Sequence, residues 1–272
     1  MMLPKKDGHT HTPFSHQNSD EVFDAYIERA MTLGFETYTI TEHAPLLSGL
    51  SLPGDYAVVT DEDIVQVKSE TARLIKKYKQ QITITKGFEV DYLANNEVNM
   101  RRFLRDNQTW LDEIVLAVHF IPDDVGELRP IDYTAEYVSA HFSNLLADPQ
   151  KFYQRYFQTV AQSVEAVIGL DVPVRIGHLG LVKKFQKVLN LPDYSDGIYR
   201  QIGDILQMIQ ARGYQLEFNA AGLSEPENGE AYPDNDIITA AQDMGIPIIY
   251  GSDAHRVHDI GRHFDLLKEV LK

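Results

Sequence analysis

The sequence predicts an α/β fold in which parallel strands form a barrel covered by helices. Seven short apolar segments alternate with segments of helical periodicity along the 272 residues. Such alternation is typical of a parallel sheet with helices packed on it. Seven βα units are enough to close a barrel, one fewer than in the common TIM barrel. The length is suited to one large α/β domain, so we expect a single domain over residues 1–272.

The expected strands are short and mostly apolar, as is usual for strands buried on both faces. None is followed by a glycine-rich phosphate loop of the nucleotide-binding folds, so those folds are disfavoured. The strands are expected at residues 3–8, 37–41, 82–88, 114–118, 174–176, 215–218 and 246–250.

Helical segments separate most of the expected strands, and capping residues mark their ends. Ser19 is the expected N-cap of the first helix, Gly34 ends it, and Asp234 caps a later helix. A longer excursion, residues 120–172, is expected to contain a polar loop and two helices, the second beginning near Pro149. The other expected helices cover residues 20–34, 61–79, 95–106, 181–189, 195–212, 234–245 and 260–271.

The composition limits the partners of the protein and the kind of metal site it can build. A net charge of −15 argues against non-specific binding to nucleic acid or to a membrane surface. The sequence has no apolar run of about 18 residues, and its first residues lack the apolar stretch of a signal peptide. Because cysteine is absent, a metal would have to be bound by histidine and carboxylates. We expect a cytoplasmic protein, and the sequence leaves its oligomeric state open.

Histidine and acidic residues follow the expected strands at their carboxyl ends. His9 and His11 form an i, i+2 pair, so an extended chain directs both imidazoles to the same side. Active sites of such barrels lie where the carboxyl ends of the strands meet, so residues that follow different strands are expected to converge. The candidate metal ligands are His9, His11, His16, His43, Glu89, His119, His178, Asp253 and His255.

This number of candidates predicts a cluster of two or three metals. A catalytic zinc ion uses about three protein ligands and a water, and Glu89 is the natural candidate for a bridging carboxylate. Clusters of this kind usually catalyse hydrolysis at phosphorus, since the ions hold the attacking and leaving oxygens. Glu42 and Asp91 are either groups that orient the metal ligands or ordinary loop carboxylates. The sequence leaves both interpretations open.

These motifs resemble the polymerase and histidinol phosphatase (PHP) superfamily, and more narrowly its histidinol-phosphatases. The resemblance covers essentially the whole chain, and residues 217–223 with Tyr232-Pro233 resemble the histidinol-phosphatase branch in particular. The matching motifs are His9-Thr10-His11, His16, Thr41-Glu42-His43, Gly87-Phe88-Glu89-Val90-Asp91, Val118-His119-Phe120, Gly177-His178-Leu179 and Ser252-Asp253-Ala254-His255.

The resemblance implies a distorted (β/α)7 TIM-like barrel with a metal site at the carboxyl ends of the strands. It also implies three divalent metal ions, which could be zinc, iron or manganese. The first ion would be bound by His9, His11, Glu89 and Asp253, the second by Glu89, His119 and His178, and the third by His16, His43 and His255.

The implied reaction is hydrolysis of a small phosphomonoester, L-histidinol phosphate, to L-histidinol and inorganic phosphate in histidine biosynthesis. The nucleophile would be a hydroxide that bridges two metals. Asp253 or His255 is the candidate for relaying a proton to the departing alcohol.

Four residues are candidates for contacts with the phosphate group. Arg155 and Tyr156 belong to the excursion, which is expected to overhang the active site, while Lys183 and Arg256 follow the fifth and seventh strands.

The sequence also departs from some relatives at the rim of the site. Gly180 stands where some relatives have aspartate, and Ser224-Glu225 stand where some have a basic residue. Three alternatives stay open, of which the C–N hydrolase is disfavoured by Glu89 and by Asp253-Ala254-His255. They are a PHP phosphoesterase for nucleotides or phosphotyrosine, an amidohydrolase-like C–N hydrolase, and a metal-binding protein without catalysis.

Overall fold

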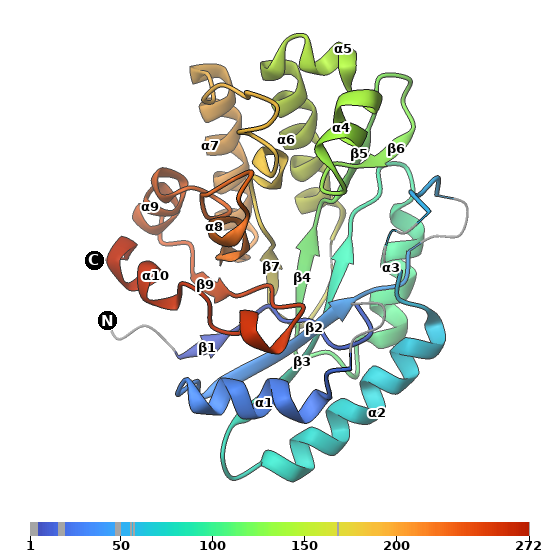
Figure 1. Ribbon diagram of the computed structural model, residues 1–272, viewed down its shortest axis with the longest axis vertical. Coiled ribbons are helices and arrows are strands. Elements are labelled where there is room, and N and C mark those ends of the chain that lie inside the picture. Colours follow the sequence, from blue (N-terminus) through green and yellow to red (C-terminus); the bar gives the residue numbers. More distant parts are fainter. Residues whose placement is uncertain are drawn as a thin grey trace.

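A seven-stranded parallel sheet forms the centre of the computed structural model (Figure 1), which describes residues 5–15, 20–46, 50–54, 56, 58–167 and 169–271. The strand order is β1-β2-β3-β4-β7-β8-β9, so each strand pairs with the next strand of the sheet along the chain. These strands are β1 (Lys6–Asp7), β2 (Thr37–His43), β3 (Thr83–Asp91), β4 (Glu113–Ala117), β7 (Val174–Ile176), β8 (Gln215–Asn219) and β9 (Ile248–Gly251).

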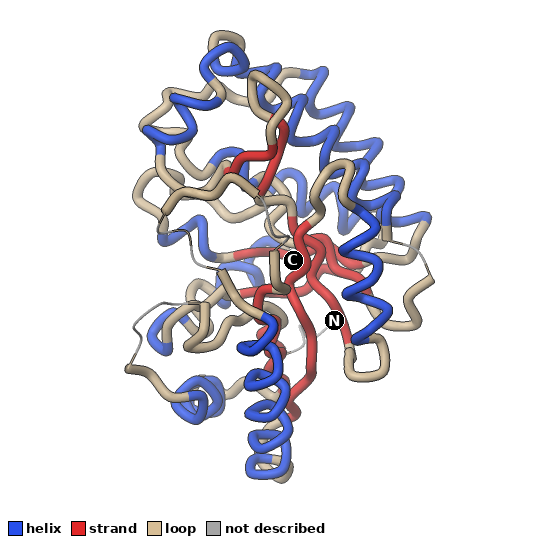
Figure 2. Tube along the Cα trace, turned by 90° about the vertical axis from the view of Figure 1, so that its right-hand side faces the viewer, coloured by secondary structure: helices blue, strands red, loops and turns tan. Residues whose placement is uncertain are grey.

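Backbone hydrogen bonds between the first and last strands join the two edges of the sheet. The Gly8 amide donates to the carbonyl of Tyr250 at 2.9 Å, and beyond the strand ends the Asp253 amide donates to the carbonyl of His9 at 2.8 Å. The strands therefore cluster in the middle of the molecule with helices outside them (Figure 2). The distorted (β/α)7 barrel expected from the sequence is confirmed.

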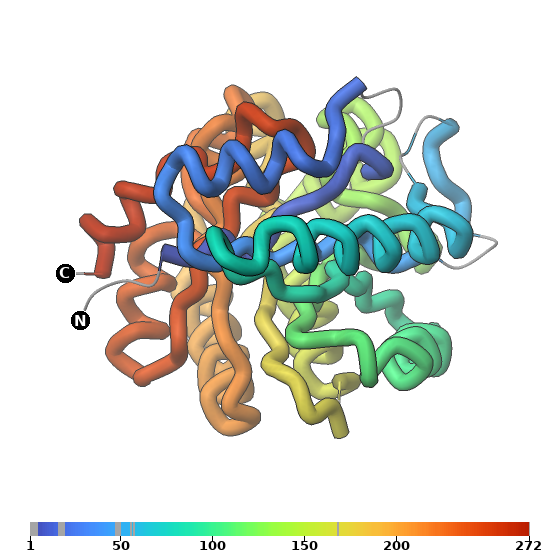
Figure 3. The backbone as a smooth tube through the Cα atoms, turned by 90° about the horizontal axis from the view of Figure 1, so that it is seen from below, coloured from blue at the N-terminus to red at the C-terminus, as the bar shows by residue number. Residues whose placement is uncertain are grey.

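The longer covering helices each bury an apolar stripe. In α2 the buried residues include Ile64, Val67 and Leu74, a spacing that places them on one face. Helices α1 and α2 lie side by side (Figure 3), and the Tyr78 hydroxyl donates to Asp24 Oδ1 at 3.0 Å between them. Apart from the helices of the excursion, the α-helices between the barrel strands are α1 (Phe23–Thr32), α2 (Asp61–Tyr78), α3 (Glu97–Asn107), α7 (Asp196–Ala211), α8 (Ala221–Ser224), α9 (Asn235–Asp243) and, after β9, α10 (Phe264–Val270). No helix in the described part of the chain is both long and apolar enough to span a membrane.

Three expected helices differ from the structure. The first begins only at Phe23, without a side-chain cap, and the expected cap Ser19 lies outside the described residues. The segment expected to be helical at 181–189 forms only a short 3₁₀ helix (Leu181–Lys183) followed by turns. The closing helix, expected over residues 260–271, begins only at Phe264, because Gly261 and His263 have positive φ angles of 73° and 55°, which interrupt a helix. A second 3₁₀ helix (Val257–Asp259) precedes this segment.

The excursion is more elaborate than the sequence predicts. In place of a polar loop it forms an antiparallel hairpin, β5 (Phe120–Pro122) and β6 (Leu128–Pro130). Three helices follow instead of two, namely α4 (Ala135–His141), α5 (Ser143–Leu146) and α6 (Pro149–Ala166). The expected start near Pro149 is confirmed, and proline is well suited to the first turn of a helix.

A buried ion network fills the barrel near the amino ends of the strands. Arg175 is completely buried, pairs with Glu113, and donates from Nη1 to the carbonyl of Gly8 at 2.5 Å. Lys6 Nζ lies 2.5 Å from the other oxygen of Glu113. Glycine is required at position 8, because a Cβ there would lie 2.7 Å from Arg175 Nη1. The ion network occupies this end of the barrel and leaves the carboxyl ends of the strands for the site described next.

Candidate metal centre

Eight of the nine predicted ligands lie together at the carboxyl ends of the strands. Within each of three groups, one nitrogen or oxygen atom per residue lies within 4.8 Å of the corresponding atoms of the others. The ninth candidate, His16, lies outside the described residues. The groups are His9, His11 and Asp253; Glu89, His119 and His178; and His11, His43 and His255.

The ligand atoms of the first group and of Glu89 are spaced as the ligands of a shared cation would be. Two ligand atoms at about 2.0–2.2 Å from one tetrahedral ion are about 3.4 Å apart. His9 Nε2 lies 3.4 Å from Glu89 Oε2 and 3.8 Å from Asp253 Oδ1. His11 Nε2 lies 3.5 Å from Glu89 Oε2 and 3.0 Å from Asp253 Oδ1. The four side chains are therefore spaced as ligands of one ion would be.

Two of the ligand atoms in this set of four side chains are buried and have no hydrogen-bond partner within the described chain. They are Nε2 of His9 and Oε2 of Glu89. Leaving such groups unsatisfied in the interior costs free energy. A cation between them would satisfy both atoms, so the residues present fit a metal ion.

Glu89 is placed to bridge two groups. Its Oε2 faces His9 and His11 and lies 3.0 Å from His43 Nδ1, whereas its Oε1 lies 2.7 Å from His178 Nε2 and 3.7 Å from His119 Nε2. One carboxylate thus presents an oxygen to each set of imidazoles, which is the arrangement expected for a bridging ligand.

The third group is a cluster of imidazole rings. The ring of His11 stacks on that of His255 with centroids 4.0 Å apart, and it lies 4.3 Å from the ring of His43. The family resemblance implied a site of His16, His43 and His255, and the structure shows His43 and His255 beside His11.

Three of the histidines, His9, His11 and His119, are held by carboxylates on their other ring nitrogens. Such contacts fix the orientation of a metal-binding imidazole and the position of its proton. Of the two interpretations that the sequence left open for Glu42 and Asp91, these contacts favour the one in which both carboxylates orient metal ligands. The pairs are Glu217 Oε1 with His9 Nδ1 at 2.7 Å, Glu42 Oε1 with His11 Nδ1 at 3.3 Å, and Asp91 Oδ1 with His119 Nδ1 at 2.9 Å.

Sequence reasoning missed the role of Glu217. This carboxylate is completely buried and also accepts a hydrogen bond from the His178 amide at 2.7 Å. Asn219, two residues further along β8, donates from Nδ2 to Glu217 at 3.2 Å and to Asp253 at 3.1 Å. The signal available in the sequence was this i, i+2 pair at a strand end.

Two ligand residues have backbone angles that non-glycine residues rarely adopt. The φ angles are 24° at His178 and 53° at Asp253. The Tyr156 hydroxyl donates to the carbonyl of His178 at 3.3 Å, and Arg262 donates from Nη2 to the carbonyl of Asp253 at 2.9 Å. Neighbouring side chains therefore hold these backbones in place.

The carboxylates attract positive charge to the site. Burial opposes the charged form of His11, but hydrogen bonds to Asp253 and Glu42 raise its pKa to about 9. Burial likewise opposes the charge of His119, but the charges of Asp91 and Glu89 raise its pKa to about 10. Because ligand nitrogens must lose their protons to bind metal, divalent ions would take over the charge-balancing role of these protons.

The three groups open into one cavity of about 290 Å³, which we call the metal-site cavity. Two polar atoms that belong to none of the groups lie buried at its wall without a partner in the described chain. They are Asp132 Oδ1 and the hydroxyl of Tyr232. Its other polar lining residues include Tyr56, Tyr133, Lys184, Glu225 and Arg262.

The four predicted phosphate contacts are not among the residues that line this cavity. Arg155 donates to the carbonyl of Pro122 at 3.1 Å, and Arg256 is exposed. Lys183 lies 3.5 Å from Glu230. Tyr156 holds the backbone of His178, as described above.

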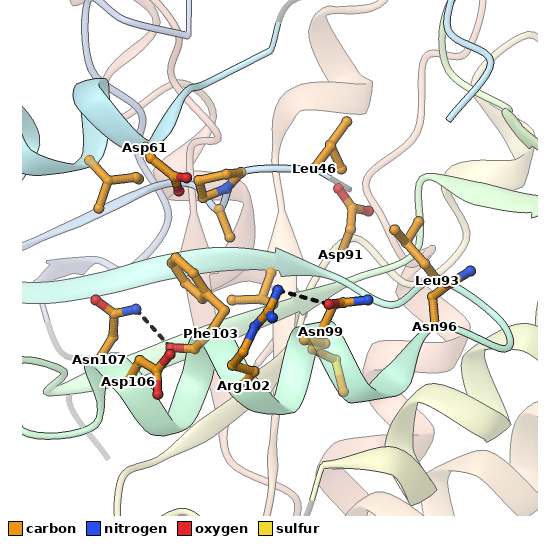
Figure 4. Close-up of a pocket in the computed structure, with 15 residues that line it drawn as sticks. Leu46, Asp61, Asp91, Leu93, Asn96, Asn99, Arg102, Phe103, Asp106 and Asn107 are labelled. Atoms are coloured by element: carbon orange, nitrogen blue, oxygen red, sulfur yellow. Dashed lines mark hydrogen bonds between the residues drawn. The ribbon is translucent and has the colours of Figure 1, made fainter. Parts of the chain in front are cut away.

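A second, larger cavity of about 770 Å³ lies beside α3 and contains none of the three groups (Figure 4). Asp91 and Leu46 line both cavities. The side chain of Arg102 turns toward Asn99 and donates to its Oδ1 at 2.9 Å. The convergent chemistry is therefore in the smaller cavity.

The chain is similar to known proteins over most of its length. The PHP domain family matches residues 7–221. The chain is 32% identical over 269 residues to the histidinol-phosphatase of Bacillus subtilis (strain 168), and the match covers 98% of this chain and 99% of that protein.

Two solved structures have the same fold. The crystal structure of a candidate histidinol phosphatase from Listeria monocytogenes has a TM-score of 0.90 and 36% identity, covering 96% of this chain and 99% of that one. A histidinol phosphate phosphatase from Lactococcus lactis, in complex with zinc, L-histidinol and phosphate, has a TM-score of 0.68 and 20% identity, covering 99% and 94%. The second likeness concerns the fold alone. This chain belongs to the PHP domain family and, within it, to the histidinol-phosphatases.

Proposed function

We propose that this protein is a metal-dependent phosphomonoesterase that hydrolyses L-histidinol phosphate to L-histidinol and inorganic phosphate. The observation that carries the proposal is the pair of buried ligand atoms, His9 Nε2 and Glu89 Oε2, which make no hydrogen bond within the described chain and lie 3.4 Å apart. The choice of substrate is supported by the near full-length similarity to the Bacillus subtilis histidinol-phosphatase. Histidine biosynthesis is the corresponding pathway.

The proposed cofactors are three divalent metal ions, with zinc, iron and manganese as candidates. When bound, such ions lower the pKa of water and neutralise charge on a phosphate group. The proposed ligands are His9, His11, Glu89 and Asp253 for the first ion, Glu89, His119 and His178 for the second, and His43 and His255 with His16 for the third.

The residues of the chain orient these ligands and move protons. Asp253 and His255 both line the metal-site cavity, with Asp253 Oδ1 3.7 Å from His255 Nδ1. We propose that one of them relays a proton to the departing alcohol.

Lys184 is the proposed protein contact of the phosphate group. It lines the metal-site cavity and has no ion-pair partner among the described residues. The roles predicted for Arg155, Tyr156, Lys183 and Arg256 as substrate contacts stay predictions, as does a cytoplasmic location.

Steady-state kinetics with the metal-loaded protein test the proposal. We expect kcat/KM for L-histidinol phosphate to exceed that for AMP and for phosphotyrosine, and we expect no hydrolysis of amides. A His9→Ala variant should lose more than about 100-fold in activity, because even loss of a residue that only orients a ligand costs 10–100-fold. Equal rates on all three phosphate esters, or full activity of His9→Ala, would contradict the proposal.

A further inference from the structure

The carboxylate of Asp132 has no assigned use in the metal centre. It belongs to none of the three groups, yet it lines the same cavity. Its Oδ1 is buried without a hydrogen-bond partner in the described chain. A buried carboxylate oxygen without a partner is costly, so a positively charged ligand that entered the cavity would gain by pairing with it.

The fold holds Asp132 close to the second group. The amide of the preceding residue, Ile131, donates to the carbonyl of His119 at 3.0 Å. On the other side, Thr134 caps α4 by accepting a hydrogen bond from the Tyr137 amide at 3.1 Å. Asp132 is therefore held between the hairpin of the excursion and a capped helix, one residue from the backbone contact with His119.

The surroundings of Asp132 are aromatic. Tyr56 and Tyr133 line the metal-site cavity, and their ring centroids are 6.3 Å apart. Burial, the negative charge of Asp132 and a side-chain interaction with that carboxylate raise the pKa of Tyr56, which keeps the hydroxyl protonated, while Asp132 Oδ1 stays without a hydrogen bond in the described chain. Such a wall suits an organic cation that carries a planar ring.

Elimination among the carboxylates of the cavity also leads to Asp132. Glu89 and Asp253 belong to metal groups, and Asp91 is bonded to His119. Only Asp132 and Glu225 remain among the acidic lining residues of the described chain. Of these two, Asp132 alone has a buried oxygen without a partner.

We propose that Asp132 binds the ammonium group of the substrate and so makes the site select phosphate esters of amino alcohols. This proposal rests on the proposed function, since the phosphate of such a substrate would be held at the metal groups. In L-histidinol phosphate only a short chain of bonds separates the ammonium group from the phosphate. The anion that binds the ammonium must therefore lie beside the metal ligands, as Asp132 does beside His119.

The test compares L-histidinol phosphate with its analogue that lacks the amino group. For the metal-loaded wild type we expect kcat/KM to be about 10- to 100-fold higher for the amine, the range for one charge-assisted hydrogen bond. In Asp132→Asn this preference should largely disappear, mainly through a higher KM for the amine. Asp132→Glu, which keeps the charge, should recover part of the preference.

Glu225→Gln is the matched control, because Glu225 is the other unassigned carboxylate of the cavity. We expect it to keep the preference for the amine. Metal content and thermal unfolding are measured for each variant, so that a loss of ions or of fold is recognised. If Asp132→Asn fails to fold, Asp132→Glu against the two substrates still measures the interaction.

The outcomes separate the two proposals. A wild type that hydrolyses both substrates equally, an Asp132→Asn variant that keeps the preference, or one that loses equally on both substrates would overturn the role of Asp132. Loss of the preference in Glu225→Gln alone would do the same and assign the ammonium site to that residue. A metal-loaded wild type that hydrolyses no phosphomonoester would instead overturn the proposed function, and the role of Asp132 with it.

Discussion

At the scale of single residues, Glu217 links ligands from different strands. Its two oxygens contact the ring of His9, after β1, and the amide of His178, after β7. Because both contacts are at 2.7 Å and fully buried, a small change in this side chain would move two ligands that belong to different groups.

We predict that Glu217→Gln weakens metal binding by about 10- to 100-fold, the usual cost of losing a carboxylate behind a ligand histidine. The shape of the side chain is kept, but one oxygen becomes an amide that cannot accept a hydrogen bond. Metal affinity is measured by competition with a chelator, with activity restored by excess metal. Glu269→Gln, exposed on α10, serves as the control, and equal affinities of the two variants would contradict the prediction.

Some residues of the site could be predicted from the sequence, and others could not. Ligands could be found because i, i+2 pairs and strand ends are visible in the sequence, as for His9 and His11. The role of Glu217 depends on complete burial beneath His9, which no local pattern reveals. Lys183 and Lys184 are neighbours with the same chemistry, and only the turn geometry after Gly180 decides which one lines the cavity.

At the scale of elements, β9 must approach β8 and β1 closely. A Cβ at Gly251 would collide with Oε1 of Glu217 and would lie 2.7 Å from Cβ of His9. Both neighbours are buried and held by each other, so neither can give way cheaply.

We predict that Gly251→Ala lowers the free energy of unfolding by about 1–3 kcal/mol and also weakens metal binding. Gly203→Ala is the control, because a Cβ at Gly203 meets nothing within 4 Å on helix α7. That substitution should stabilise the protein by about 0.5–1 kcal/mol. Denaturant unfolding measures both variants, and a Gly251→Ala variant as stable as the wild type would show that the strands can separate there.

Most elements could be predicted because their signals are local. The apolar segments of β2, β3 and β4 and the capping residue of α9 mark those elements directly. The hairpin was missed since its two strands have only three residues each and both end in proline, Pro122 and Pro130. Its existence depends on pairing across the loop, which sequence periodicity does not report.

At the scale of the whole molecule, the ion network and the metal centre lie toward opposite ends of one barrel. Burial opposes ionisation of Glu113, but the charges of Arg175 and Lys6 lower its pKa to about 2. A carboxyl with a lowered pKa stabilises the fold above its unfolded pKa, and this contribution is lost as the pH falls through the folded value.

We therefore predict that the free energy of unfolding falls between about pH 4.5 and pH 2, with a contribution of about 3 kcal/mol from Glu113. In Glu113→Gln the fall over this range should be shallower. Both proteins are unfolded in denaturant with a chelator present, so that metal release does not add to the slope. Parallel curves for the two proteins would contradict the assignment.

Removing the metals should affect stability as well as activity. Without the ions, only protons on the neighbouring imidazoles would balance the charges of Glu89 and Asp253. We predict that a chelator abolishes activity and lowers the melting temperature, and that zinc or manganese restores both, since ions that bind only the folded state stabilise it. An unchanged melting temperature after verified metal removal would argue against a site built on these ligands.

The most direct test of the account is anomalous diffraction from crystals grown with metal and inorganic phosphate. We predict anomalous peaks about 2.0–2.2 Å from His9 Nε2 and from both oxygens of Glu89, with phosphate beside them in the metal-site cavity. Electron density in which Glu89 contacts no ion, or a map with no anomalous peak among His9, His119 and Asp253, would contradict it.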